Sequence, residues 1–301
     1  MATQEYTIGA LWMDGPLSYL EQLCLKSFLD AGHRVRLYHY GDLENVPDGV
    51  ECADANEILP GNNFLVHEET GSLTLHSDLF RYRMLAKTDK IIWADTDAYC
   101  RKPFIPTNGH LYGYQSSHSI NVGVLSFPKD SETFEKILEF TQDEYAVPTW
   151  YRPRFVRKLQ RAKDEGNPVH VSKLPWGVWG PSILTHYLKE TGEIKYALPK
   201  EYLYPFSFGE RRLMQRRRLP NVNEFITCNT MSIHFFGHRM RKLLSARHDG
   251  TPLPTSVIGQ LLSKHGIDPH KAPIPGALEK YEERKRIAAE KVALKAAEDN
   301  V

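Results

Sequence analysis

Apolar residues recur with two different periods in the first forty positions, and the two periods alternate along the chain. Residues 6–12 form the short apolar run of a buried strand, residues 18–31 place apolar side chains at helical spacing, and residues 35–40 alternate. Gly32 follows the helical segment, at a position where helices commonly end. This strand–helix–strand order predicts a parallel α/β sheet.

The pattern extends the expected sheet as far as about residue 248. Helices are predicted at residues 77–88, 131–142 and 181–190, and strands at residues 91–94, 110–115, 120–127 and 231–236. Residues 144–180 show no clear period, and we expect them to be irregular. We therefore expect residues 1–248 to form one α/β domain, with a mostly parallel, Rossmann-like sheet flanked by helices.

The composition changes after residue 248. Residues 249–276 are rich in proline and glycine, which predicts a loop-rich linker. Residues 277–301 are dominated by alanine, glutamate, lysine and arginine, and we expect an exposed C-terminal helix there. Its apolar positions are too sparse for a convincing coiled coil.

The overall charge and the cysteine content indicate what kind of partner the protein has and in which compartment it resides. The 301 residues carry a net charge of +1, which argues against nucleic acid as the partner. Four scattered cysteines without a C-x-x-C spacing indicate free thiols in a reducing compartment. The first residues show no secretory signal, and no apolar run approaches the roughly 20 residues of a membrane span. We expect a cytoplasmic protein that meets membranes only peripherally.

Two carboxylates end the apolar run at residues 91–94. Asp95 and Asp97 are one residue apart, so both can reach one hard cation such as Mg²⁺ or Mn²⁺, which often keeps phosphate oxygens in its remaining positions. Aspartate pairs are also common in turns. The preceding helix carries Asp78 and Arg81 on one face, either as a helix cap with an ion pair or as groups that bind sugar hydroxyls.

These residues together resemble a known family. The pattern Ser77-Asp78-x-x-Arg81-Tyr82, followed by Ile92-Trp93-Ala94-Asp95-Thr96-Asp97, is similar to the core of glycosyltransferases with a DXD motif. That group includes the yeast initiating mannosyltransferases, the α-1,4-galactosyltransferases and the clostridial glucosylating toxins. The resemblance implies a GT-A-type fold, a divalent cation, and a nucleotide-sugar donor that is UDP-linked and transferred with retention of configuration.

Three further landmarks follow the order of that family. Trp12 ends the first strand, where the resemblance places a ring that stacks on the base; otherwise it is a core tryptophan. Asn121 resembles the asparagine of the family strand near the donor and acceptor sugars, although an asparagine before glycine is often a turn residue. Gly180 lies in a Trp-Gly-Pro segment that resembles the loop opening a helix near the site.

A closing segment near residue 234 resembles the H-x-x-G-x-x-K pattern of glycogenin-type transferases. The resemblance makes His234 a third metal ligand and lets the diphosphate approach Gly237. The expected lysine is replaced by Met240. Its role would pass to a neighbouring cation, for which the candidates are Arg239, Arg241 and Lys242.

The leading hypothesis is a metal-dependent hexosyltransferase of the kind used in polysaccharide biosynthesis, acting on a glycan, a lipid-linked glycan or another hydroxyl acceptor. Its expected residues fall into three groups: catalytic Asp78, Arg81 and Asn121; donor-binding Trp12, Asp78, Arg81, Asp95, Gly237, Arg239 and Lys242; and metal-binding Asp95, Asp97 and His234. The alternatives are another metal-dependent phosphate enzyme, a nucleotidyltransferase or phosphohydrolase, and an inactive module that binds nucleotide sugars.

Two basic stretches lie outside this expected site, at residues 151–163 and 211–218. Such stretches are usually solvated faces. Their functional alternatives are attraction to anionic lipid headgroups or to an anionic acceptor.

Overall fold

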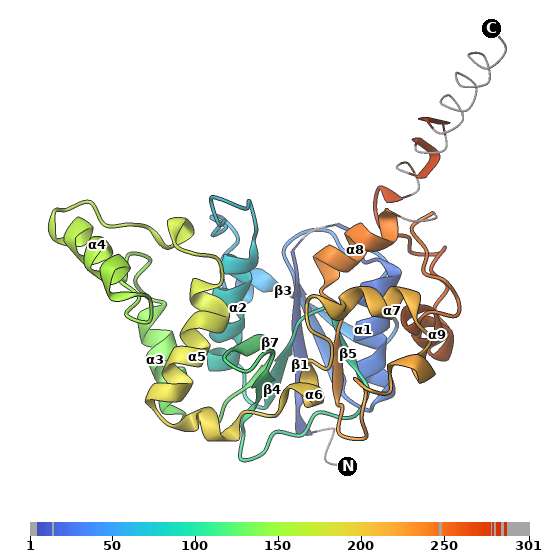
Figure 1. Ribbon diagram of the computed structural model, residues 1–301, viewed down its shortest axis with the longest axis horizontal. Helices are drawn as coiled ribbons and strands as arrows, with labels where there is room; N and C mark the ends of the chain where they lie inside the picture. The colour runs from blue at the N-terminus through green and yellow to red at the C-terminus, as the bar shows by residue number, and fades with distance from the viewer. Residues whose placement is uncertain are drawn as a thin grey trace, which may run out of the picture.

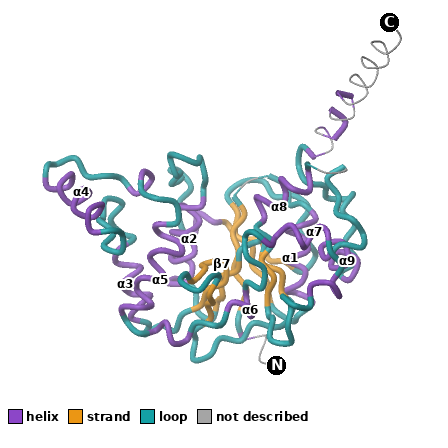
Figure 2. The backbone as a smooth tube through the Cα atoms, viewed as in Figure 1, coloured by secondary structure: helices purple, strands orange, loops and turns teal. Residues whose placement is uncertain are grey.

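A six-stranded sheet lies at the centre of the molecule in the computed structural model (Figures 1 and 2). The structure describes residues 5–13, 15–246, 249–277, 279, 281–283 and 286–287. Within them the sheet order is β3-β2-β1-β4-β7-β6. Its strands are β1 (Thr7–Trp12), β2 (Arg34–His39), β3 (Val50–Asp54), β4 (Ile91–Ala94), β6 (Leu111–Tyr114) and β7 (Ile120–Ser126).

The strand directions confirm the expected mostly parallel α/β sheet. Strand β1 pairs in parallel with β2 and β4, and β2 pairs in parallel with β3. Strands β7 and β6 form an antiparallel edge beside β4. The parallel strands therefore end together on one side of the sheet, which is where open α/β sheets usually bind ligands.

Both faces of the central strands are buried, as their continuous apolar runs require. In β4, Ile92 and Ala94 join one hydrophobic cluster, whereas Ile91 and Trp93 join another. Helices cover the two faces (Figure 1): α1 (Tyr19–Asp30) packs on the first cluster, and α2 (Thr74–Lys87), α3 (Glu132–Phe140) and α5 (Ile183–Glu190) pack on the second.

A second, smaller sheet extends the fold beyond the end of β4. Strands β5 (Ala98–Cys100) and β8 (Ser232–His234) pair antiparallel, although more than 130 residues separate them. A third hydrophobic cluster forms around them and α1. The remaining helices are α4 (Pro153–Asp164), α6 (Lys200–Leu203), α7 (Leu213–Arg216), α8 (Gly237–Ser245) and α9 (Val257–Lys264).

Each of the two segments expected to be irregular contains an α-helix. Residues 144–180 contain α4, whose dense positive charge hides a weak apolar pattern. Residues 249–276, expected to be a loop-rich linker, contain α9, which Ser256 caps at its N-terminus. The apolar face of α9 and the following Ile274 belong to the third cluster, so this segment packs as part of the core.

The expected helix at residues 277–301 lies mostly outside the described residues. That helix and the domain boundary at residue 248 stay predictions. Among the described residues, every helix is too short or too polar to cross a bilayer.

Candidate functional site

Asp95 and Asp97 lie in the short connection between the two sheets. The Asp95 N–H donates to the Gly123 carbonyl on β7 at 2.8 Å, and the Ala98 N–H donates to the Asp95 carbonyl at 2.9 Å. The connection is therefore fixed at both ends, and it carries two carboxylates at the carboxyl end of β4.

The pairing of β5 with β8 brings His234 to these carboxylates. His234 stands opposite Ala98, and its Nδ1 lies 3.3 Å from Oδ1 of Asp97. Ligand atoms of Asp95, Asp97 and His234 all lie within 4.8 Å of one another. Asp97 Oδ1 and His234 Nδ1 are buried and make no hydrogen bond with the described residues. Two carboxylates and an imidazole with unused ligand atoms fit a divalent cation such as Mn²⁺ or Mg²⁺.

The carboxylates of this region lie directly against glycine backbone. A β-carbon at Gly123 would lie 2.9 Å from Oδ2 of Asp95, and one at Gly237 would lie 3.1 Å from Oδ2 of Asp97. A β-carbon at Gly180 would similarly lie 2.9 Å from Asp78 Oδ2. A β-carbon at Gly123 or Gly180 would force the carboxylate to shift, and one at Gly237 would require Asp97 to give by a few tenths of an ångström, so glycine at the three positions keeps the acids where they lie.

Arg81 connects Asp78 to the metal-site carboxylates. Its Nη2 lies 3.3 Å from Asp78 Oδ1 and 3.6 Å from Asp95 Oδ1, and its Nη1 donates to the Val122 carbonyl at 3.0 Å. The guanidinium carbon also lies 4.9 Å from the centre of the Trp93 ring. Arg81 is thus a buried cation held by two acids and an aromatic face.

Asp78 is the most deeply buried acid of the group. Burial raises its pKa to about 7; the Arg81 charge opposes this rise, and the Asp95 charge adds to it. Asp78 Oδ1 makes no hydrogen bond within the described residues. Tyr82 donates to the Trp179 carbonyl at 2.7 Å and so holds the Gly180 loop against α2.

Asn121 borders the same region from β7. Its Oδ1 accepts from the Gly123 N–H at 2.7 Å, and its Nδ2 donates to Gln115 Oε1 at 2.7 Å. Its side chain is partly exposed. The amide is therefore held close to Asp95 by the same glycine that the carboxylate contacts.

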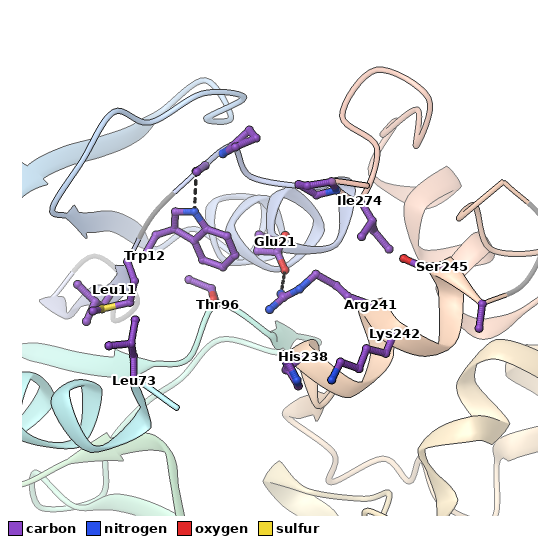
Figure 3. A pocket seen from close by; sticks show the side chains of 15 residues that line it. Leu11, Trp12, Glu21, Leu73, Thr96, His238, Arg241, Lys242, Ser245 and Ile274 are labelled. Atoms are coloured by element: carbon purple, nitrogen blue, oxygen red, sulfur yellow. Dashed lines mark hydrogen bonds and ion pairs between the residues drawn. The ribbon is translucent and has the colours of Figure 1, made fainter. Parts of the chain in front are cut away.

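A cavity of about 750 Å³ opens beside the end of β1 (Figure 3). A second cavity of about 290 Å³ shares Trp12, Thr96 and Arg241 with it and reaches Asp95 and Asp97. Together they lead from Trp12 to the carboxylates.

Arg241 and Trp12 face each other across this space. The guanidinium carbon of Arg241 lies 5.5 Å from the centre of the Trp12 ring, whose Nε1 donates to the Gly15 carbonyl at 2.8 Å. Figure 3 shows Arg241 paired with Glu21 of α1. Glu21 is buried and also accepts from the Ser18 N–H at 2.9 Å. The sequence around Glu21 does not reveal this role, because the S-x-x-E pattern from Ser18 to Glu21 indicates only a helix start.

Helix α8 points its N-terminus at the metal-site acids. Phe236 adopts a left-handed conformation with φ of 57°, and the next N–H, that of Gly237, donates to Asp97 Oδ2 at 2.5 Å. Lys242 lines the larger cavity, whereas Arg239 lines neither cavity. Met240, at the position of the expected lysine, is buried in the third cluster.

Tyr204 is a second residue that the sequence pattern did not single out. It is buried, its hydroxyl accepts from the Val124 N–H at 2.9 Å, and its ring meets that of His234 edge-on at 5.7 Å. Tyr204 thus supports the imidazole from a segment without regular periodicity.

Comparison with known proteins gives structural likeness only. No protein-family model and no curated protein matches the chain. Similar solved structures include a PaToxG glycosyltransferase, with 14% identity over 64% of this chain and 71% of that chain at a TM-score of 0.41. Mouse xyloside xylosyltransferase 1 matches with 12% identity over 76% of this chain and 96% of that chain at a TM-score of 0.38.

A galactosyltransferase LgtC, solved with donor and acceptor sugar analogs, matches with 12% identity over 76% of this chain and 86% of that chain at a TM-score of 0.35. These structural neighbours are glycosyltransferases, but likeness this distant carries no argument about what this chain binds. The function has to be argued from the site itself.

Proposed function

We propose that this protein is a metal-dependent glycosyltransferase of the GT-A type that takes a nucleotide sugar as its donor. The observation that carries the proposal is the Asp95–Asp97–His234 cluster, whose ligand atoms lie within 4.8 Å of one another. The two carboxylates line a cavity that continues to an aromatic ring and a cationic helix. Such a path suits a diphosphate with a base at one end and a sugar at the other.

In this proposal Asp95, Asp97 and His234 hold Mn²⁺ or Mg²⁺, which supplies positive charge opposite the leaving nucleoside diphosphate. Arg241 and Lys242 extend that charge along the larger cavity. Trp12 offers its ring to the base. Gly237 lets the diphosphate approach the backbone at the start of α8.

The sugar end of the donor is assigned to the Asp78–Arg81 pair and to Asn121. Arg81 lines the smaller cavity, so its guanidinium is available to a sugar hydroxyl, while Asp78 lies behind it and keeps it in place. Asn121 lies beside Asp95 but lines neither cavity, and its assignment near the anomeric centre rests on the resemblance. Arg239 lines neither cavity, and its assignment to donor binding rests on the resemblance alone.

The finer assignments also rest on the resemblance to the DXD-motif family. They are a UDP-linked donor, a hexose as the transferred sugar, retention of anomeric configuration, and a glycan, a glycolipid or another hydroxyl as acceptor. The cytoplasmic location is proposed instead from the four scattered cysteines, which indicate free thiols in a reducing compartment.

The decisive experiment is a screen of nucleotide sugars for release of free nucleotide with Mn²⁺, with Mg²⁺ and with EDTA. We expect nucleoside diphosphate to appear with one donor and to vanish in EDTA. Asp97→Asn should lower the rate by about 100-fold or more, because the cation that stabilises the leaving group loses one of its ligands. The control is Asp89→Asn, since Asp89 is an exposed acid that pairs with Lys129, away from both cavities.

Other products would contradict the proposal. Release of nucleoside monophosphate with a sugar phosphate would indicate a phosphohydrolase. Formation of nucleoside triphosphate and sugar phosphate when pyrophosphate is added to the assay would indicate a nucleotidyltransferase. Tight, metal-dependent UDP binding without turnover of any donor would indicate a module that binds nucleotide sugars without catalysis.

A further inference from the structure

Helix α4 presents a row of positive charge that the proposed transfer reaction does not use. Arg154, Arg157, Lys158 and Arg161 follow the spacing i, i+3, i+4, i+7, which places them on one face of the helix. All four side chains are exposed. In Figure 1, α4 is the outermost labelled helix at the left of the view, whereas α8 lies to the right of the central strands.

The row is not neutralised by nearby acids. Among the basic residues of α4, only Lys163 forms an ion pair with a described residue, at 2.9 Å from Asp143. Of the other acids of this surface, Glu144 pairs with His170, Glu68 accepts from Ser172 and Asp164 accepts from Gln160, while Glu165 follows the row at the C-terminal end of α4. A helix face that serves only to be solvated usually mixes both signs of charge and pairs them at i, i+4.

The apolar residues of α4 determine which way its basic residues point. Leu159 is buried in the second hydrophobic cluster and Phe155 packs against it. The basic face of α4 is therefore held outward by the packing of its apolar face.

Exposed apolar side chains lie on segments that hydrogen bonds connect, directly or through one another, to the end of α4. Tyr145, Trp176 and Val66 are exposed by 43%, 56% and 39%. The Tyr145 segment is tied to the end of α4, because Lys163 donates to the Tyr145 carbonyl at 3.2 Å.

Main-chain contacts tie the other two segments to the same surface. The Val171 N–H donates to the Glu144 carbonyl at 2.8 Å, which joins the chain leading to Trp176 to that of Tyr145. The His67 ring bonds the Leu174 carbonyl at 2.9 Å, and the Glu68 N–H donates to the Ser172 carbonyl at 3.0 Å. These bonds bring the Val66 loop beside the Trp176 segment.

We propose that α4 and these flanking residues form a docking surface for an anionic lipid bilayer. A basic helix face attracts acidic headgroups, and tryptophan and tyrosine rings favour the boundary between headgroups and acyl chains. A nucleic acid would use the same cations, but an exposed aliphatic residue such as Val66 offers nothing to a phosphate or a base. The inference is independent of the proposed transferase activity.

The test is sedimentation of the full chain with vesicles of phosphatidylcholine alone or with about 30 mol% phosphatidylserine. We expect binding only to the anionic vesicles and its loss between about 0.1 M and 1 M salt. The triple variant R154Q/R157Q/R161Q should bind about 100-fold more weakly, since each cation near the surface contributes roughly a factor of five. The matched control is R212Q/R216Q/R218Q, drawn from the other basic stretch.

A second pair of variants tests the aromatic contribution. Trp176→Ala should weaken vesicle binding, whereas Ile105→Ala, which removes an equally exposed apolar side chain from another loop, should not. UDP binding and circular dichroism should be unchanged in every variant.

Three results would overturn the inference. One is equal binding to neutral and anionic vesicles, and another is an equal loss in the control triple. The third is salt-sensitive binding of single-stranded RNA without binding to anionic vesicles, which would assign the surface to nucleic acid.

Discussion

At the scale of single residues, the site depends on positions without a side chain. Gly123, Gly180 and Gly237 each leave room for a carboxylate that a β-carbon would displace. The acids can therefore approach main chain that belongs to distant elements, which gathers charge into a small volume. The close approach of the carboxylates favours glycine at these positions, since none of the three has a positive φ.

Gly123→Ala tests this requirement directly. The new methyl group would lie 2.9 Å from Asp95 Oδ2 and 3.0 Å from Asn121 Oδ1, so the carboxylate must turn away from its present position. We expect Mn²⁺ affinity, measured by calorimetry, to fall at least about tenfold, as when a group that orients a ligand is removed. Gly209→Ala is the control, because its β-carbon would meet only Ser207 Oγ, at 3.9 Å. Equal affinities in the two variants would contradict the geometry.

The buried Asp78 makes stability depend on pH in the metal-free protein. Its pKa is raised from 3.8 to about 7 in the folded state, so between these values the folded chain binds one more proton than the unfolded chain. Stability contributed by this group is therefore present below about pH 4 and is lost as pH rises towards 7. The slope is at most about 1.4 kcal/mol per pH unit.

Urea unfolding of wild type and Asp78→Asn in EDTA, between about pH 4 and 7, measures this loss. We expect the difference in unfolding free energy between the two proteins to shift in favour of Asp78→Asn as pH rises. A pH-independent difference would show that Asp78 is ionised throughout this range.

At the scale of elements, the site joins segments that are far apart in the sequence. Nothing in the pattern of one segment predicts its contact with another. The buried runs of β1, β4 and β7 predicted the central sheet, because strands buried on both faces are continuously apolar. The polar edge strand β3 and the three-residue β5 carried no such signal. The pairing of β5 with β8 depends on contacts made only in the folded chain, so local periodicity could not place His234.

The contact between α1 and α8 also joins two segments that are far apart in the sequence. Glu21 caps α1 through Ser18 and also pairs with Arg241, 220 residues later. Glu21→Gln should keep the cap, since glutamine also serves in a capping box, but it removes the charge that holds Arg241. We expect KM for the donor to rise roughly tenfold with kcat little changed, the mark of lost ground-state binding.

The control for this link is Glu135→Gln, an exposed acid in the first turn of α3. The stabilities of both variants should stay close to that of wild type in urea unfolding. An unchanged KM in Glu21→Gln would mean that the Trp12 ring alone orients Arg241.

At the scale of the whole molecule, the question is where the folded unit ends. The proline and glycine content of residues 249–276 predicted a linker, yet composition does not report which apolar residues find a partner. The Tyr19 N–H donates to the Ala272 carbonyl at 2.7 Å, and Ile274 lines the larger cavity. The segment after residue 248 thus contributes side chains to the third cluster and forms part of the wall of the larger cavity.

Truncation shows whether the folded unit ends at residue 248 or includes the segment that follows. A fragment of residues 1–248 would lose Val257, Ile258, Leu261, Leu262 and Ile274 from the third cluster, all of which are buried. At roughly 1.5–3 kcal/mol for each buried aliphatic side chain, the loss is comparable to the roughly 5–15 kcal/mol that holds a typical domain folded. We expect the 1–248 fragment to be unfolded or aggregated, whereas a fragment of residues 1–287 should unfold cooperatively in urea and bind UDP. A 1–248 fragment with the same urea midpoint as the longer one would instead support a domain boundary at residue 248.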